Sequence, residues 1–115
     1  MYKSSIIVTI SNEYALTENF FNNLLLIIKD DINVFAVVDG VTDTQTVSFL
    51  QRLQEQNDNI SVTFNNENLG FSKANNIGAF MSTSPYLIFL NSDTFPIGNA
   101  LYQMIDFMDK SPELG

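Results

Sequence analysis

The first candidate functional residue is Asp39, which directly follows the apolar run Val34–Val38. A carboxylate at the end of a strand can accept hydrogen bonds from the N–H groups of a nucleobase or from the hydroxyls of a ribose. The structural alternative is a simple turn, because Asp-Gly pairs such as Asp39-Gly40 are common in turns. The residue by itself is compatible with both roles.

The second candidate is the segment Asn91-Ser92-Asp93, which follows the apolar run Tyr86–Leu90. A carboxylate at the mouth of a buried strand can hold a divalent metal ion, which in turn binds phosphate oxygens. Asn91 can assist by hydrogen bonding or through a water molecule. The alternative is a helix cap for a segment that begins near Pro96, since Asp is a favoured capping residue.

The third candidate is the segment 68–78, in which Gly70 precedes a predicted helix. Glycine lets the backbone approach a ligand closely, and a helix N-terminus favours anions. The segment is neither a Walker loop nor a G-x-G-x-x-G motif. Asn75 and Asn76 are mediocre helix formers, so that two together in a helix require a reason. The alternative is the exposed surface of an asparagine-rich protein.

The composition excludes several chemistries. The chain has 115 residues, with 5 Lys plus Arg against 13 Asp plus Glu, and it contains no His and no Cys. Ser-His-Asp and Cys-His catalysis, disulfides, and imidazole or thiolate metal sites are therefore impossible. A bound metal must be oxygen-ligated, as Mg²⁺, Mn²⁺ and Ca²⁺ are. The net charge of −8 argues against binding nucleic acid through a basic face.

The sequence also lacks the patterns of membrane insertion and secretion. No apolar run approaches the roughly 18 residues that span a bilayer. The first apolar run, Ile6–Ile10, is short and is followed at once by Ser11-Asn12-Glu13, which is a poor signal peptide. We expect a soluble, cytoplasmic chain.

Four short strands and four helices are expected to position the candidate residues. Apolar, β-branched runs predict strands over residues 5–10, 34–38, 60–64 and 86–90. Helical spacing predicts helices over residues 16–29, 42–56, 71–81 and 96–108. The strand over 60–64 alternates in polarity and is expected nearer an edge of the sheet. The core face of the third helix is predicted to consist of Phe71, Ala74, Ile77 and Met81.

This alternation predicts an α/β fold, a three-layer αβα arrangement around a mostly parallel sheet, with one domain over residues 1–115. In such sheets, ligands bind outside the carboxyl ends of the strands. The three candidate segments all follow predicted strands. We therefore expect them to meet at one rim of the sheet.

Taken together, the segments resemble family 2 glycosyltransferases, which have the GT-A fold. The resemblance covers nearly the whole chain and includes the opening strand into Asn12, Val37-Val38-Asp39, Asn68-x-Gly70-Phe71-x-x-Ala74-Asn75-Asn76-x-Gly78, and Phe89-Leu90-Asn91-Ser92-Asp93-Thr94. The last two motifs are the specific ones. The asparagine pair is most similar to the rhamnosyltransferase-type branch.

The resemblance implies a nucleotide site with Asp39 facing the base, uracil or thymine, of a UDP- or dTDP-sugar. It implies that the nucleotide pocket is lined, largely through backbone, by Ile10, Ser11 and Asn12. It also implies that the nucleotide and diphosphate lie along Gly70, Ala74 and Asn76.

The resemblance further implies a metal site, in which Asn91 and Asp93 replace the Asp-x-Asp of the family and Asp93 holds Mg²⁺ or Mn²⁺. The metal would neutralise the departing diphosphate. Three positions depart from the family pattern. Family members often have Asn where this chain has Gly40, and many have Arg where it has Asn75. Asn91 stands at the first Asp of the Asp-x-Asp motif, so that this carboxylate is missing.

The sequence ends at Gly115 before the acceptor site and the general base of the family would occur. We interpret it as the N-terminal donor-binding portion of a truncated GT-A domain, inactive alone, from an inverting enzyme of cell-surface polysaccharide synthesis. The implied acceptor is a saccharide or a lipid-linked acceptor, and the full-length protein would act at the inner face of the membrane. Uncovered sheet edges predict self-association into a homo-oligomer.

A second hypothesis is a non-catalytic, flavodoxin-like α/β module for protein interaction or regulation, motivated by the missing base. Binding of a protein partner without nucleotide, unaffected by Asp93→Ala, would favour it over the enzyme.

Overall fold

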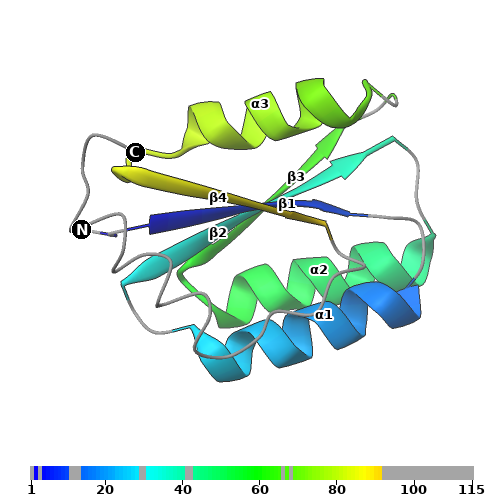
Figure 1. Cartoon of the computed structure of the whole chain (residues 1–115). Coiled ribbons are helices and arrows are strands. Elements are labelled where there is room, and N and C mark those ends of the chain that lie inside the picture. The colour runs from blue at the N-terminus through cyan, green and yellow to red at the C-terminus, as the bar shows by residue number, and fades with distance from the viewer. Residues whose placement is uncertain are drawn as a thin grey trace.

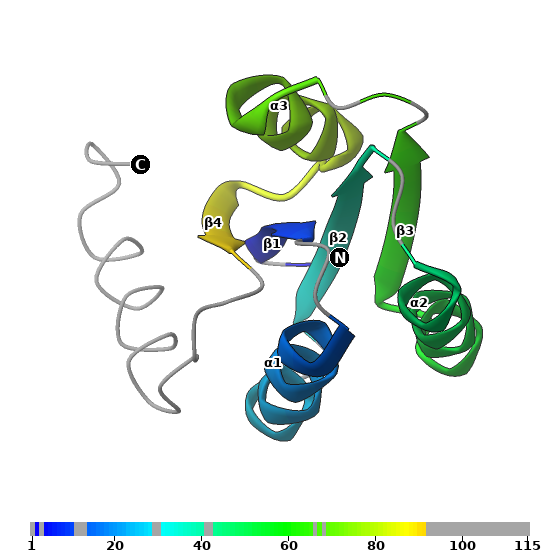
Figure 2. The same cartoon turned by 90° about the vertical axis from the view of Figure 1, so that its right-hand side faces the viewer.

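The structure, a computed structural model, describes residues 2, 4–10, 14–28, 31–40, 43–65, 67 and 69–91. Its strands are β1 (Ser4–Ile10), β2 (Ile32–Asp39), β3 (Ile60–Asn65) and β4 (Tyr86–Asn91). All pairings are parallel and the order across the sheet is β3-β2-β1-β4, which Figure 2 shows from the carboxyl ends of the strands. In this part of the sheet β3 pairs only with β2, which confirms its predicted edge position.

Within the described residues, three helices cover the two faces of the sheet. Helices α1 (Tyr14–Ile27) and α2 (Thr44–Gln56) lie on one face, and α3 (Phe71–Met81) lies on the other (Figure 1). The three-layer αβα fold is therefore confirmed. The predicted helix over 96–108 lies outside the described residues.

The main core lies between the sheet and the pair α1 and α2. Side chains alternate along a strand, and one set from β1 and β2 enters a cluster with the buried faces of the two helices. The central strands β1 and β2 are buried on both faces, which explains why their sequences are apolar throughout rather than alternating. The core members are Ile6, Val8, Ile10, Phe20, Phe21, Leu24, Ile32, Val34, Ala36, Val38, Leu50, Leu53, Ile60 and Ile88.

The opposite layer is thinner because small residues bring α3 close to the sheet. Ala74 and Gly78 are buried, and a Cβ added at Gly78 would lie 2.4 Å from Ile7 Cγ2 of β1. Met81, predicted to face the core, is instead 41% exposed. Its sulfur accepts a hydrogen bond from the Thr63 hydroxyl at 3.3 Å, so it lies over β3, the outermost described strand on that side.

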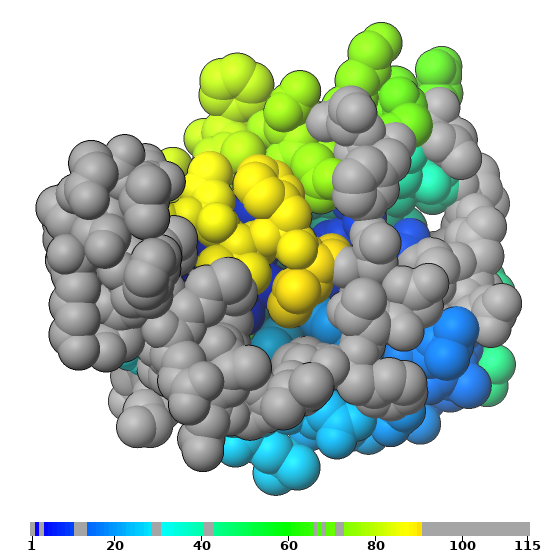
Figure 3. Space-filling view, in the orientation of Figure 1, coloured from blue at the N-terminus to red at the C-terminus, as the bar shows by residue number. Residues whose placement is uncertain are grey.

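Apolar side chains of β4 and α3 remain open to solvent. Phe89 is 48% exposed, Leu87 is 37% exposed and Phe80 is 90% exposed. Figure 3 shows β4 at the molecular surface, next to α3. In the described sheet β4 pairs with β1 alone.

Candidate functional site

The candidate site is the rim formed by the carboxyl ends of the strands. Asp39 at the end of β2 pairs in register with Asn65 at the end of β3. On the other side, Ile10 of β1 pairs with Val38, and Thr9 pairs with Asn91 of β4. The strands therefore end at nearly the same level, which brings the last residues of all of them to one rim (Figure 2).

Among the described residues of this rim, Asp39 is the polar side chain with the most hydrogen bonds. Its Oδ1 accepts a hydrogen bond from the backbone N–H of Leu69 at 2.8 Å and one from Asn65 Nδ2 at 3.3 Å. Its Oδ2 accepts a hydrogen bond from the backbone N–H of Gly70 at 2.9 Å. The carboxylate therefore ties the end of β2 to the end of β3 and to the segment that leads into α3.

These contacts also set the charge state of Asp39. Desolvation raises the pKa of the carboxyl, but the hydrogen bonds from Leu69, Asn65 and Gly70 together outweigh it and hold the pKa below its ordinary value. Hydrogen bonds to the ionised form favour that form. Asp39 is therefore an anion at neutral pH.

Helix α3 begins directly behind this carboxylate. Gly70 is the N-cap residue, with φ of 92° and no side-chain capping hydrogen bond. A positive φ of this size favours glycine. The Gly70 carbonyl accepts the Ala74 N–H at 3.0 Å, which forms the first turn of the helix. The N-terminus of α3, which favours anions, is thereby placed at the rim.

The asparagine pair in α3 divides between the two sides of the helix. Asn75 is only 9% exposed, and its Oδ1 is sealed from solvent without a hydrogen-bond partner in the described structure. Asn76 is exposed. Ala74 is fully buried against the sheet, so that any approach of its side chain to a ligand needs a movement of the helix. The interpretation of the pair as mere exposed surface is wrong for Asn75.

The remaining predicted site residues lie partly beyond the described structure. Ile10 ends β1, and its side chain belongs to the core, which is compatible with the backbone role predicted for it. Ser11, Asn12 and Asp93 lie outside the described residues. Asn91 is described as the last residue of β4. Within the described ranges, no three Asp, Glu, His or Cys side chains gather into a metal site.

Sequence reasoning missed two partners of Asp39. Asn65 is not among the predicted site residues, and Leu69 lies within the candidate segment 68–78 without a predicted role of its own. A signal for Asn65 does exist, because it ends its strand as Asp39 ends its own. Leu69 acts through its backbone, so its residue type carries no signal.

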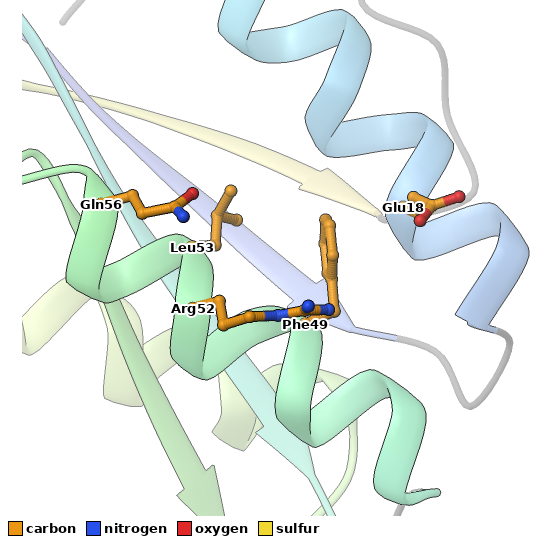
Figure 4. A pocket seen from close by; sticks show the side chains of 5 residues that line it. All are labelled: Glu18, Phe49, Arg52, Leu53 and Gln56. Carbon is orange, nitrogen blue, oxygen red and sulfur yellow. The ribbon is translucent and has the colours of Figure 1, made fainter.

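A separate hollow lies on the helical layer of α1 and α2. It has a volume of about 260 Å³ and is lined by Glu18 of α1 and by Phe49, Arg52, Leu53 and Gln56 of α2 (Figure 4). It lies between the two helices and not at the strand ends. Of the predicted site residues that the structure describes, none lines it.

Comparison with known proteins assigns the chain to a family. The profile of the family described as glycosyl transferase family 2 matches residues 5–114. The chain belongs to this family. The predicted resemblance is therefore confirmed at the level of the family, whereas the rhamnosyltransferase-type branch stays a prediction.

Curated relatives of this family 2 chain include the poly-β-1,6-N-acetyl-D-glucosamine synthase of Staphylococcus aureus strain COL. It is 30% identical over 104 residues, which are 90% of this chain and 25% of the relative. The chain thus spans about a quarter of the length of the curated relatives that it matches.

Solved structures of glycosyltransferases share the fold. The mannosyltransferase PcManGT of Pyrobaculum calidifontis, in complex with GDP-Man and Mn²⁺, has a TM-score of 0.80 at 21% identity, over 92% of this chain and 32% of that one. S. aureus TarS 1–349, in complex with UDP-GlcNAc, has a TM-score of 0.81 at 22% identity, over 94% of this chain and 31% of that one.

None of the described helices of the family 2 chain is long and apolar enough to cross a membrane.

Proposed function

We propose that this family 2 chain is the donor-binding part of a glycosyltransferase that binds a nucleotide-diphosphate sugar at the rim described above. The observation that carries the proposal is the N-terminus of α3, which begins at the strand ends behind Asp39 and a glycine of positive φ. The first-turn N–H groups and the helix dipole favour a diphosphate there. Gly70 and Asn76 would lie along the ligand. The structures of similar fold that contain UDP-GlcNAc and GDP-Man support this class of ligand.

The proposed base is uracil or thymine. A carboxylate offers about four acceptor positions, and hydrogen bonds from described residues fill three of those of Asp39. The remaining position, on Oδ2, suits a single N–H donor. Uracil and thymine each present one such donor, N3–H, whereas guanine presents two neighbouring donors. This count supports a UDP- or dTDP-sugar.

The proposed metal ion is Mg²⁺ or Mn²⁺, held by Asp93 with help from Asn91. The donor chemistry of the chain fits a hard cation, since the sequence contains neither His nor Cys and is rich in carboxylates. When bound, the metal neutralises charge on the leaving diphosphate. The Mn²⁺ in the similar mannosyltransferase supports this assignment.

The proposed reaction is an inverting transfer of the sugar to a saccharide or lipid-linked acceptor. Similarity to a poly-β-1,6-N-acetyl-D-glucosamine synthase supports a polysaccharide product. Inverting transfer needs a general base for the acceptor hydroxyl, and no residue matched to the family motifs supplies it. We therefore expect these 115 residues to bind donor without transferring sugar.

Isothermal titration of the chain with UDP, dTDP and GDP, in Mg²⁺, Mn²⁺ or EDTA, tests the proposal. We expect UDP or dTDP to bind with metal, EDTA to abolish binding, and Asp93→Ala to weaken it at least tenfold. Asp58→Ala is the matched control, because Asp58 is an exposed carboxylate in the turn before β3, at the opposite end of the sheet. Absence of nucleotide binding with either metal would overturn the proposal.

A further inference from the structure

We propose that Asp39 is a positioning residue, which fixes the Leu69–Gly70 turn and through it the N-terminus of α3. This role is separate from any contact that Asp39 makes with a base. Its consequence for ligand binding rests on the proposed function, whereas its consequence for the turn does not.

The direction of the hydrogen bonds at the turn supports this role. Two successive backbone N–H groups, those of Leu69 and Gly70, donate to the two different oxygens of one carboxylate, at 2.8 and 2.9 Å. These donors lie 30 and 31 residues beyond Asp39 in the chain. The turn is therefore anchored to β2, a central strand of the described sheet, and not to its own neighbours.

Helix α3 has no side-chain cap of its own at its start. Leu69 and Gly70 are both exposed, and the N-cap position of α3 has no side-chain capping bond. In α2, by contrast, the N-cap Asp43 accepts the Thr46 N–H at 2.7 Å from within its own helix. At the start of α3, the acceptor is instead the carboxylate of Asp39, which lies at the end of β2.

The first hydrogen bond of α3 links the turn to the helix. The Gly70 carbonyl accepts the Ala74 N–H in the first turn of α3. A displacement of Gly70 therefore shifts the first-turn N–H groups that would face the diphosphate. Ligand affinity should then depend on Asp39 even when the ligand has no base.

The experiment uses Asp39→Asn, which keeps the size of the side chain but replaces one acceptor oxygen by an amide donor. Amide hydrogen exchange by NMR is measured first, without ligand. We expect exchange at Leu69 and Gly70 to accelerate about tenfold or more, as expected for loss of a charge-assisted hydrogen bond. Unchanged exchange at both amides would overturn the proposal, whatever the chain binds.

Titration with the complex of Mn²⁺ and inorganic pyrophosphate then separates positioning from base contact. We expect Asp39→Asn to weaken pyrophosphate binding about tenfold, as it weakens UDP binding. A loss confined to UDP would show that Asp39 acts only at the base and would overturn the positioning role. If the unmodified chain binds neither ligand, the proposed function fails while the exchange result still decides the inference.

Two further variants keep the test decisive if Asp39→Asn does not fold. Gly70→Ala strains the same turn through its positive φ, and its new methyl group meets no atom of the described residues within 4 Å. It should weaken pyrophosphate binding with the carboxylate intact, and unchanged binding would contradict the inference. Asp43→Asn is the matched control, since it alters a hydrogen-bonded carboxylate at the N-cap of α2 and should leave pyrophosphate affinity and the exchange of Leu69 and Gly70 unchanged.

Discussion

Replacing Gly78 by alanine tests the close packing that places α3 and its N-terminus. The added Cβ would lie 2.4 Å from Ile7 Cγ2 and 3.3 Å from Val37 Cγ2. Both neighbouring side chains are fully buried in the central strands. The substitution therefore asks whether the sheet or the helix moves.

The expected magnitude follows from two opposing terms. Carbon atoms in contact normally lie about 3.5–4.0 Å apart, so the closer contact is short by more than about 1 Å. The branched Ile7 side chain is stiff at χ1 and cannot turn away freely, and overpacking of this kind costs about 1–3 kcal/mol. Alanine returns about 1 kcal/mol through its higher helix propensity. We expect a net loss of about 1–2 kcal/mol in the free energy of unfolding, because the overlap is large.

Urea denaturation followed by circular dichroism measures this loss. The control is the same substitution in an Ile7→Ala background, where the overlapping Cγ2 is absent and the nearest Ile7 atom, Cβ, lies 3.6 Å away. There Gly78→Ala should become neutral or stabilising. An increase in stability on Gly78→Ala in the unmodified chain would refute the argument that small residues set the distance between α3 and the sheet.

Three further predictions concern charge, the buried amide and the open apolar surface. The pKa values of Asp39 and Asp43 lie below the ordinary 3.8, so the stability that they add is present above that value and lost as the pH falls through the lower folded pKa values. Acid unfolding followed by circular dichroism should show a loss below pH 3.8 that Asp39→Asn and Asp43→Asn each reduce. Asn75→Leu removes a buried acceptor without a partner in the described structure and should raise the free energy of unfolding by about 1–2 kcal/mol in urea; a loss of stability would mean that the amide is satisfied by other parts of the chain. Phe89→Thr should lower self-association in light scattering, because it removes an exposed apolar side chain from β4. The control is Leu26→Gln, which replaces an exposed apolar side chain on α1, and an equal effect of both variants would contradict a role of β4.

The order of the elements and the location of the rim were predictable from local patterns. Short β-branched runs alternated with helical spacing, and this alternation permits few arrangements other than a parallel, helix-covered sheet. The strands begin and end within about two residues of their predicted bounds. Since parallel strands share one carboxyl edge, Asp39 and Asn91 had to end at one rim of the sheet.

The orientation of α3 could not be predicted in the same way. The apolar spacing favoured a face with Phe71, Ala74, Ile77 and Met81. Ala74 is buried as predicted, but Ile77 is only half-buried and Met81 is exposed, and the helix buries Asn75 and Gly78 instead. Hydrophobic spacing weighs large side chains, whereas the distance between a helix and a sheet is set by the smallest side chains at the contact. Gly78 permits the close approach, and Asn75 is buried as a result of its position beside Ala74.

The sequence by itself determined the parallel α/β fold, the oxygen-only donor chemistry and the rim where the polar segments meet, because each follows from residue type or from spacing along the chain. Only the tertiary structure decided what Asp39 does there. Its donors are a side chain on β3 and two backbone N–H groups about 30 residues away. A backbone N–H is present in every residue except proline, so no residue type could have identified those partners. Strand register and the entry of the chain into α3 bring them together, and both depend on packing across the whole sheet.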